Sequence, residues 1–537
     1  MSGEAQEHVQ RGVVGAVGTI GAATLTSRIL GYVRDMVVAH AFGAGPVTDA
    51  FLVAFRIPNL LRRLLAEGAL STAVIPVFTE TLTRGGPEAF ARMTRAVVGA
   101  ALVVLCLVST AGVLLAPWVV AVMAPGWRAD TGLFELAVTL TRVMFPYLAL
   151  VGLAALAMGA LNAHHRFFTA AVGPAVLNVA MILAVLGLAS SMTPPIMALA
   201  VGVLVGGLGQ LVVQLPELRR LGVSVVPSSE WRHPAVAQIA HRLWPAVFAL
   251  ASVQITVVVN TLLASLLPAG TVSHLYYADR VMEFPLGIFG IALATAALPS
   301  MAAQAARRDI PGLRATVEFA LRLSAFVAVP AAVGLVLLGG PIVTVLFQRG
   351  GFTASDAALT TQALAGYAVG LPAFSATRIA AQTFYALGDT RTPVWVGFLS
   401  VAANVVLALL LMWPLRQGGL ALASSLSAYV NVLGLCWLLR HRLDGPRGAP
   451  LWCSFGQTLA ASVPLALWCA WLGGWFGIAS SAPAGPGRHG VVWLLLALGG
   501  GAAIYAAGAA ALRSAELVTV LSMLRRRRGV LPHPGGR

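Results

Sequence analysis

Arginines and acids occur inside three stretches of this sequence that are otherwise apolar enough for a membrane interior. The charged residues are Arg28, Arg34 and Asp35 in the first stretch, Asp49, Arg56, Arg62, Arg63 and Glu67 in the second, and Asp279, Arg280 and Glu283 in the third. A charge at the bilayer centre costs about 2.5 to 3.5 kcal/mol on insertion scales. Charges of this kind usually face a watery cavity and serve a function there.

The spacing of these charges separates local ion pairs from arginines without a neighbouring acid. Asp35 follows Arg28 by nearly two helical turns and shares its stripe, whereas Arg34 points about 100° away from Asp35. Two further pairs are spaced for contact on one helix face, namely Arg63 with Glu67 and Arg280 with Glu283. In the first two stretches together, five arginines face three acids. The surplus predicts a cationic cavity.

Guanidinium groups suit phosphate oxygens, because their planar fork donates two parallel hydrogen bonds. The surplus therefore favours an anionic cargo and would repel a cationic one. All 35 basic residues are arginine, so the buried cations cannot easily lose their charge. The alternative is that the charges form internal ion pairs which only tie helices together.

The composition indicates an all-α integral membrane protein. The chain has 537 residues, of which 58% are hydrophobic and 10% charged, with a mean hydropathy of +0.85. A soluble protein would carry about 25% charged residues. Apolar stretches predict about fourteen transmembrane helices, near 13–41, 47–83, 94–124, 131–162, 168–190, 194–221, 237–267, 271–306, 312–348, 355–386, 392–412, 417–441, 452–478 and 490–513.

The arginines of the loops predict the topology. With a cytoplasmic N-terminus, the inward loops hold most of them, and the outward loops hold only Arg128, Arg349, Arg416 and Arg488. Both termini are then cytoplasmic, including the basic stretch Arg525–Arg528. This bias explains the net charge of +16 better than nucleic-acid binding does, because no basic domain gathers the charge.

The longest inward loop, near 217–242, divides the predicted helices into two lobes. We expect an N-terminal lobe at 1–230 with helices 1–6, a C-terminal lobe at 231–450 with helices 7–12, two extra helices at 451–513, and a basic cytoplasmic tail at 514–537. Similar patterns of charge and proline around Asp49 and Asp279 indicate a parallel repeat. Such repeats place a transport site near the midplane, between two rocking halves. The extra helices either face lipid or accommodate a long lipid tail.

Other polar residues are better explained by structural contacts than by catalysis or metal binding. The four cysteines and the pair His164-His165 lack the spacing of metal ligands or of a catalytic set, so we expect a protein that is not an enzyme. Asn178 and Asn404 are expected to form hydrogen bonds between helices. Glu318 and Arg322, four residues apart, predict an ion pair on one helix.

Several stretches carry a resemblance to a known family. They are Ser27-Arg28-Ile29-Leu30-Gly31 with Arg34-Asp35, Phe42-Gly43-Ala44-Gly45, Thr48-Asp49-Ala50-Phe51, Arg56-Ile57-Pro58-Asn59-Leu60-Leu61-Arg62-Arg63, Ala66-Glu67-Gly68-Ala69, Tyr276-Tyr277-Ala278-Asp279-Arg280 with Glu283-Phe284-Pro285, and Gly388-Asp389-Thr390-Arg391-Thr392-Pro393. The chain resembles the MurJ (formerly MviN) family, the lipid II flippases of bacterial peptidoglycan synthesis. That family lies within the superfamily of multidrug, oligosaccharidyl-lipid and polysaccharide exporters.

The resemblance implies a fold and a set of site residues. It implies fourteen helices in two lobes, a cationic cavity formed by helices 1, 2, 7 and 8, and a groove beside the last two helices for the polyprenyl tail. The substrate-binding residues that it implies are Arg28, Arg34, Arg62 and Arg280. The supporting or gating residues are Ser27, Asp35, Asp49, Glu67, Asp279 and Glu283. No catalytic residue and no metal ligand is implied.

The function implied is the flipping of lipid II from the cytoplasmic to the outer leaflet of the bacterial plasma membrane, by alternating access, for cell wall synthesis and cell shape. The expected partners are lipid II with its undecaprenyl pyrophosphate, membrane lipids, and proteins of cell wall synthesis or division, without nucleic acid. No cofactor is expected. Some members bind sodium through acids of helices 7, 11 and 12, which are absent from those spans here. Membrane potential, rather than sodium, is therefore the expected influence on transport.

Two other classes of transporter stay open at this point. A flippase for another undecaprenyl-linked glycan would keep the same anion-binding cavity, and only the head group would differ. A drug or cation antiporter should have acids dominating its cavity, which is the opposite of the arginine surplus in the first two charged stretches.

Overall fold

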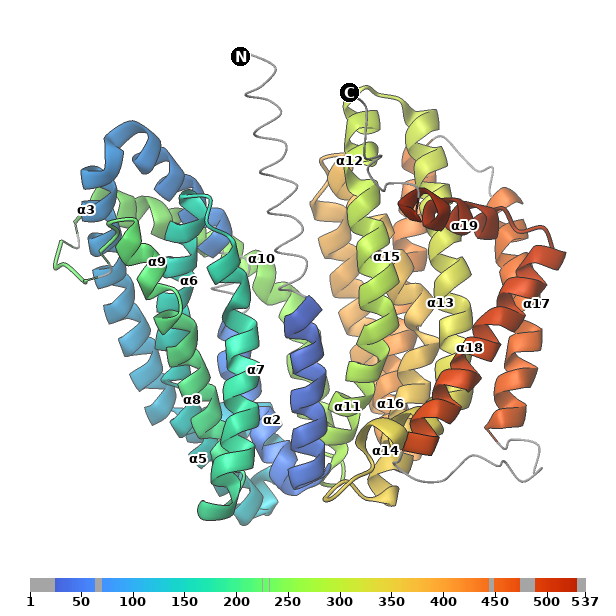
Figure 1. Ribbon diagram of the computed structural model, residues 1–537, viewed down its shortest axis with the longest axis horizontal. Helices are drawn as coiled ribbons and strands as arrows, with labels where there is room; N and C mark the ends of the chain where they lie inside the picture. The colour runs from blue at the N-terminus through green and yellow to red at the C-terminus, as the bar shows by residue number, and fades with distance from the viewer. Residues whose placement is uncertain are drawn as a thin grey trace, which may run out of the picture. The chain divides into compact units, whose positions relative to one another are not determined.

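The computed structural model describes residues 25–62, 70–224, 226–230, 232–443, 449–473 and 488–528, and helices are the only regular elements among them. The first helix occupies residues 25–42. The others are α2 (Pro46–Arg62), α3 (Leu70–Leu114), α4 (Ala116–Met123), η2 (Pro125–Ala129), α5 (Thr131–Met144), α6 (Tyr147–Ala163), α7 (Phe168–Leu188), η3 (Ala189–Ser191), α8 (Met197–Val212), α9 (Leu215–Arg220), α10 (Pro234–Ser265), α11 (Thr271–Pro285), η4 (Leu286–Ile291), α12 (Ala292–Ala306), α13 (Ile310–Phe347), α14 (Ala354–Val369), α15 (Leu371–Ala386), α16 (Arg391–Arg442), α17 (Ala449–Leu472), α18 (Arg488–Ala511) and α19 (Ala515–Arg528) (Figure 1).

The all-helical membrane fold is confirmed. In the described part of the chain, eight helices are long and apolar enough to cross a membrane by length and composition. The count of fourteen stays a prediction, because several predicted spans are divided or merged. The predicted span 355–386 consists of two helices, α14 and α15. The predicted spans 392–412 and 417–441 belong to one long element, α16, which is broken at Arg416.

Breaks in the helices have identifiable causes. α3 turns at Gly86, whose φ of 73° suits glycine because it has no Cβ. α11 ends at Pro285, which lacks a backbone N–H, and a π-helical turn, η4, follows it. Pro285 divides the predicted span 271–306, whereas Gly86 lies in the gap between the predicted spans 47–83 and 94–124.

Contacts divide the chain into two compact units. Unit 1 ends at Ser273 and also includes Gly350–Phe352, and unit 2 begins at His274. The short return segment joins unit 1 because the Gly351 N–H donates to the His40 carbonyl at 2.7 Å. By contacts α10 groups with unit 1, whereas the sequence analysis placed residues 231–450 in the second lobe.

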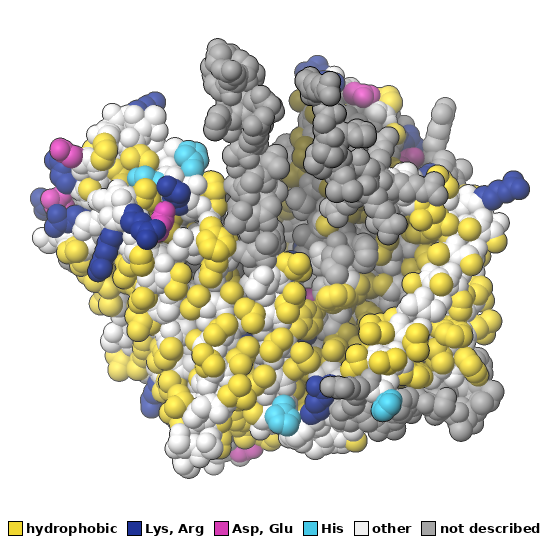
Figure 2. Space-filling model, viewed as in Figure 1, with side chains coloured by type: hydrophobic (Ala, Val, Ile, Leu, Met, Phe, Trp, Pro, Cys, Tyr) yellow, Lys and Arg dark blue, Asp and Glu magenta, His cyan; other side chains and the backbone are white. Residues whose placement is uncertain are grey.

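Unit 1 has an aromatic and aliphatic core between α3, α6 and α10. Phe78 and Phe90 are buried and meet edge to face, with ring centroids 5.5 Å apart. Met93 and Leu161 complete the packing at this point. The apolar side chains continue over the outside: on the face shown in Figure 2 they cover much of the length of the unit, while arginines gather near the end where α9 lies. This is the distribution expected of a membrane-spanning unit with a basic end.

Unit 2 is built around α13, which packs against α12, α14, α15 and α17. α17 and α18 pack against each other and against α13 (Figure 1). The Tyr505 hydroxyl of α18 donates to the Phe326 carbonyl at 2.7 Å, which ties this pair of helices to the unit. These contacts position the two extra helices that the sequence predicted at 451–513.

The segment after α18 forms a helix, α19, within the stretch that the sequence analysis described only as a basic tail. Its first turn holds the buried Glu516, which pairs with Arg322 at 2.8 Å and accepts a hydrogen bond from Ser454. The predicted pair of Glu318 with Arg322 is wrong: Glu318 pairs instead with Arg314 at 2.9 Å. The acid that pairs with Arg322 is Glu516 of α19, which spacing along a single helix cannot reveal.

Candidate functional site

Arg34 is the centre of a buried polar cluster in unit 1. Its Nε and Nη2 donate to Oδ1 of Asp35 at 3.0 and 2.6 Å, and its Nη1 donates to Oδ1 of Asn178 at 3.1 Å. The side chains of Arg34 and Asp35 are only 9% and 3% exposed. Asn178 belongs to α7, so this cluster joins α7 to the helix at 25–42.

The cluster corrects one expectation from the sequence. Arg34 was expected to point away from Asp35, since consecutive helical residues diverge by about 100°. The long arginine side chain bends back over that angle and contacts Asp35 with two nitrogens. Arg34 therefore has a carboxylate partner and does not belong to a surplus of unpaired cations. The helical spacing describes where Cβ atoms point, and not how far a guanidinium can reach.

Ser27 and Arg28 lie one to two turns before this cluster on the same helix. The Ser27 carbonyl accepts a hydrogen bond from Nδ2 of Asn178 at 3.1 Å. One amide side chain thus contacts both Ser27 and Arg34. Arg28 is exposed. It is the arginine on this helix that a ligand could reach without displacing a buried group.

Asp49 is buried in unit 1 and caps a helix other than its own. It lies in the first turn of α2, and its carboxylate accepts hydrogen bonds from the backbone N–H groups of Gly270 at 2.6 Å and Ser273 at 2.7 Å. The Ser273 hydroxyl also donates to it. These N–H groups belong to the start of α11, where a helix has unpaired donors and favours negative charge. Asp49 therefore caps the first turn of α11, at the end of unit 1.

The remaining site residues of α2 lie toward its far end. Arg62 is half-buried, and its Nε donates to Oδ1 of Asn59 at 3.0 Å. Arg56 donates to the Thr261 hydroxyl of α10. Glu67, and with it the predicted pair of Arg63 and Glu67, lies outside the described residues.

In unit 2, Arg280 lies among groups from its own helix, α11. Its Nη1 donates to Oε2 of Glu283 at 3.0 Å, which confirms the pair predicted from the spacing. Its guanidinium carbon lies 5.5 Å from the ring centroid of Tyr276, within range of a cation–π contact. The side chains of Arg280 and Glu283 are 30% and 45% exposed. Asp279 beside them is half-buried.

The structure brings together some of the predicted site residues and leaves others in separate contacts. Ser27 and Arg34 both contact Asn178, and Asp35 pairs with Arg34. Arg280 pairs with Glu283, whereas Asp49 is occupied in capping α11. The chemistry available is that of hydrogen-bond donation by fixed guanidinium groups to an anion. In the described ranges, no group of three His, Cys, Asp or Glu side chains is arranged to hold a metal ion.

Two polar residues have a larger role than the sequence analysis gave them. Asn178 was expected only to link helices, which is confirmed, but it also orients Arg34. His274 was not singled out; it is buried and contacts Asp356 of α14 at 3.3 Å. An asparagine inside an apolar helix is a visible signal. The contact of a histidine with an aspartate 82 positions away gives no such signal in the sequence, because only the fold brings the two residues together.

Comparisons with known proteins show which family the chain is similar to. A family profile described as "Lipid II flippase MurJ" matches residues 38–481. "Probable lipid II flippase MurJ" of Vibrio cholerae serotype O1 is 39% identical over 420 residues, which cover 77% of this chain and 80% of the relative. "Lipid II flippase MurJ" of Burkholderia cenocepacia is 38% identical over 473 residues, which cover 86% and 91% respectively.

Solved structures are similar in fold. "Lipid II flippase MurJ, inward closed conformation" superposes with a TM-score of 0.76 at 21% identity, over 91% of this chain and 97% of that chain. An inward-facing multidrug resistance MATE family transporter of the MOP superfamily gives a TM-score of 0.62 at 15% identity, over 80% and 98% of the two chains. Both are similar to this chain in fold over most of its length.

Proposed function

We propose that this chain, which belongs to the lipid II flippase MurJ family, flips lipid II from the cytoplasmic to the outer leaflet of the bacterial plasma membrane for peptidoglycan synthesis. The family consists of transporters and not of enzymes. The observation that carries the proposal is the exposed guanidinium of Arg28, on an apolar helix of unit 1 and one to two turns before the buried pair of Arg34 and Asp35. Such a group suits the pyrophosphate of a lipid-linked sugar better than it suits a cation.

The mechanism we infer is alternating access. Arg28, Arg34, Arg62 and Arg280 contact the pyrophosphate, while Ser27, Asp35, Asp49, Glu67, Asp279 and Glu283 orient these arginines or the helices that carry them. Asp35 and Asn178 hold Arg34 in one orientation, so little side-chain entropy is lost when an anion binds. Asp49 on α2 accepts hydrogen bonds from the first N–H groups of α11, which holds this turn in place.

Membrane potential acts on this cycle because charge crosses the bilayer. Moving one elementary charge is worth about 2.3 kcal/mol per 100 mV. We propose no sodium site and no cofactor. Both termini lie in the cytoplasm in this proposal, because the arginine-rich loops then lie inside. Proteins of cell wall synthesis or division are the expected partners.

The first experiment is complementation in bacterial cells depleted of their own flippase. Arg28→Ala and Arg280→Ala should abolish growth, because each removes a guanidinium proposed to contact pyrophosphate. Arg128→Ala is the matched control, since Arg128 is exposed on η2 and should support wild-type growth. Immunoblots of membranes establish equal amounts of each variant. Wild-type growth with Arg28→Ala or Arg280→Ala would overturn the proposed site.

The second experiment identifies the substrate. Purified protein in vesicles should move fluorescent lipid II between leaflets, and unlabelled lipid II should compete. The remaining alternative is a flippase for another undecaprenyl-linked glycan. Stronger competition by such a glycan lipid than by lipid II would replace the proposed substrate while keeping the anion site.

A further inference from the structure

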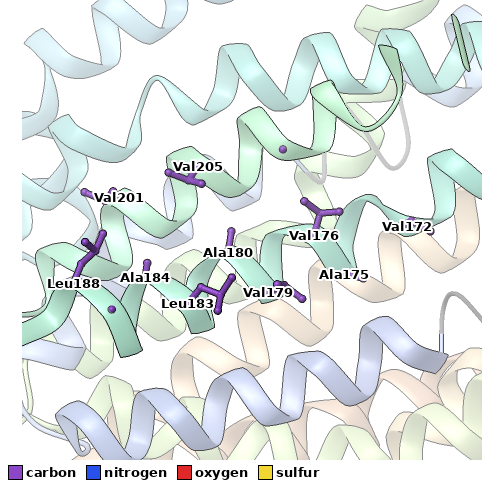
Figure 3. Close-up of a pocket in the computed structure, with 12 residues that line it drawn as sticks. Val172, Ala175, Val176, Val179, Ala180, Leu183, Ala184, Leu188, Val201 and Val205 are labelled. Carbon is purple, nitrogen blue, oxygen red and sulfur yellow. The ribbon is translucent and has the colours of Figure 1, made fainter. Parts of the chain in front are cut away.

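A groove and a polar pair lie outside the residues of the candidate site, and they differ in chemistry. The groove runs between α7 and α8 and is lined only by valine, alanine, leucine and glycine (Figure 3). Such a lining suits the hydrocarbon of the surrounding bilayer and selects no particular ligand. The polar pair consists of His274 and Asp356 in unit 2, and the proposed mechanism does not use it.

His274 and Asp356 join the starts of two helices of unit 2. The side chain of His274, near the start of α11, is only 4% exposed, and its Nε2 lies 3.3 Å from Oδ1 of Asp356. Asp356 lies in the first turn of α14, where its other oxygen, Oδ2, accepts a hydrogen bond from the backbone N–H of Thr353 at 2.8 Å. The starts of α11 and α14 therefore meet at one end of unit 2 (Figure 1).

This contact can exist in two protonation states. The ordinary pKa of histidine is about 6.5, so its charge changes within the physiological pH range. A neutral ring with its hydrogen on Nε2 donates an ordinary hydrogen bond to the carboxylate. The imidazolium instead forms an ion pair with a charge-assisted hydrogen bond, which is about twice as strong. The side chain of Asp356 is 15% exposed, so a proton can reach the pair from water.

The charged groups around the start of α11 act on this pair to different degrees. Among the residues that the structure describes, Asp356 is the charged group whose field acts on the ring of His274. Arg349, which follows α13, is exposed and donates to a carbonyl in the last turn of that helix at 2.8 Å. Asp49 of α2 accepts from Ser273, the residue before His274. The charges further along α11 are Asp279, Arg280 and Glu283.

α11 carries the pair on one face and its candidate site residues on the other. Tyr277 and Val281 follow His274 at helical spacing and are buried. The ring of Tyr277 lies 5.0 Å from the ring of Phe347 on α13, so this face packs into unit 2. At 100° per residue, the charges of α11 lie about 140° to 240° around the helix from His274, and they are Asp279, Arg280 and Glu283. Anchoring the first face therefore sets the direction of the charged face.

We propose that His274 and Asp356 form a proton-binding site that regulates flipping. A proton from the outer solution converts their contact into an ion pair, which holds α11 against α14 and keeps Arg280 oriented toward the pyrophosphate. Release of that proton to the same solution weakens the anchor. The pair responds to the outer pH because, in the proposed topology, the loop with Arg349 before α14 lies outside. Flipping is therefore faster when the outer solution is acidic. This inference rests on the proposed function.

The first measurement follows the proton itself. Purified full-length protein with ¹³C-labelled histidine is titrated by NMR between about pH 5 and pH 8. The signal of His274 is the one that disappears in His274→Gln, and in wild type it should titrate within this range. A ring that keeps one protonation state throughout would overturn the inference. That result would leave the proposed function intact, since the titration involves no lipid.

Transport in vesicles gives the functional readout. Wild type should flip lipid II about fivefold faster at about pH 6 than at about pH 8, because only the protonated pair anchors α11 strongly. His274→Gln and Asp356→Asn should both flatten this profile, since neither variant can form the ion pair. His164→Gln is the matched control: His164 is also partly buried, but its ring contacts the Ala160 carbonyl of α6 in unit 1. It should keep the wild-type profile.

Thr353→Ala separates protonation from the stability of the α14 cap. The Thr353 hydroxyl donates to Oδ2 of Asp356 at 2.9 Å, so its removal weakens the cap and leaves the carboxylate and His274 in place. This variant should keep the pH profile. A profile as flat as that of Asp356→Asn in Thr353→Ala, or an unchanged profile in His274→Gln, would overturn the inference. Absence of lipid II transport by wild type at every pH would instead contradict the proposed function.

Discussion

The two units hold their candidate arginines in different ways. Arg34 in unit 1 is buried and fixed by a carboxylate and an amide from two helices, whereas Arg280 in unit 2 is partly exposed and pairs with an acid in its own turn. A buried pair has lost its hydration, so removing one partner leaves a charge that nothing compensates. A partly exposed pair keeps water nearby and contributes little to stability. Arg34 and Asp35 therefore have a structural role that Arg280 and Glu283 lack.

This difference affects how mutations should be interpreted. A loss of function at Arg34 or Asp35 combines lost substrate contact with lost folding stability. A loss of function at Arg280 or Glu283 reflects mainly the loss of substrate contact, with little loss of folding stability. The predictions below test whether burial divides the two sites in this way.

The largest effect is expected for Asp35→Ala. The substitution leaves Arg34 buried without its carboxylate, which should lower the free energy of unfolding by about 3 to 5 kcal/mol. Thermal unfolding in detergent measures this loss against wild type. The double variant Arg34→Leu/Asp35→Leu should recover most of the stability but not transport, because it removes both buried charges. If the double variant were as unstable as Asp35→Ala, the packing of these side chains rather than their charge would be responsible.

A second large effect is expected for Asp49→Ala. The backbone N–H groups of Gly270 and Ser273 would lose a buried acceptor, which should cost about 2 to 3 kcal/mol. Asp49→Asn keeps one oxygen acceptor and should cost less. Hydrogen exchange at the start of α11 gives the local readout, since the Ser273 amide should exchange faster in Asp49→Ala. Unchanged exchange there would show that Asp49 does not hold α11.

The sequence predicted the fold class, which is confirmed, and it located the charges within apolar helices, because both depend on signals that are local in the chain. Long apolar runs require helices in a membrane, and charges inside those runs are visible without a structure. The pair of Arg280 and Glu283 followed from helical spacing alone. Contacts within a single helix were therefore predictable from the sequence.

Contacts between segments that are distant in the sequence could not be predicted from it. Asn178 lies 144 positions from Arg34, and Glu516 lies far from Arg322, so their pairing depends on how helices pack. Asp49 was noted as a charge in an apolar run and was assigned to the site by the family resemblance, yet its contacts are those of a helix cap. The helix breaks at Gly86 and Arg416 fall in the gaps between predicted spans. The break between α14 and α15, inside the predicted span 355–386, was missed, because an apolar run does not record its changes of direction.

An intermediate effect is expected for Asn178→Ala. Arg34 would keep Asp35 but lose the amide that holds its Nη1, which should cost about 1 to 2 kcal/mol. Transport should fall without being abolished, because the guanidinium remains but its orientation is less restricted. Asn404→Ala is the control, since Asn404 is also a buried asparagine, with its hydrogen bond to Ser424 inside unit 2. Equal loss of transport in both variants would point to general weakening of helix packing.

A small effect on stability is expected for Glu283→Gln. The pair with Arg280 is partly exposed, so its loss should cost about 0.2 to 1 kcal/mol. Transport should nevertheless change, because Arg280 loses the carboxylate that orients it. Thermal unfolding and vesicle transport are measured on the same preparation. A loss of stability as large as that of Asp35→Ala would remove the distinction between the two ion pairs.

The smallest effect is expected at Asp389, an accessible counterpart to the buried cap made by Asp49. Hydrogen bonds from the backbone N–H and the hydroxyl of Thr392, which outweigh partial burial, lower the pKa of this carboxyl. Arg391 and Arg442 add to the same direction. Because the pKa is lower in the folded state, the carboxylate stabilises α16 above the unfolded value of about pH 3.9. That contribution is lost as the pH falls through the lower, folded pKa.

The pH dependence of unfolding separates this cap from the rest of the protein. Between about pH 6 and pH 3, the Tm of wild type should fall slightly more steeply than the Tm of Asp389→Asn, because the amide does not titrate over the range in which the carboxylate loses its charge. At neutral pH the two proteins should differ less than wild type and Asp49→Asn do. Water can replace the hydrogen bonds of the accessible cap made by Asp389, whereas it cannot reach those of the buried cap made by Asp49. A larger loss at Asp389 than at Asp49 would mean that burial is not what divides the charges of this protein into structural and functional groups.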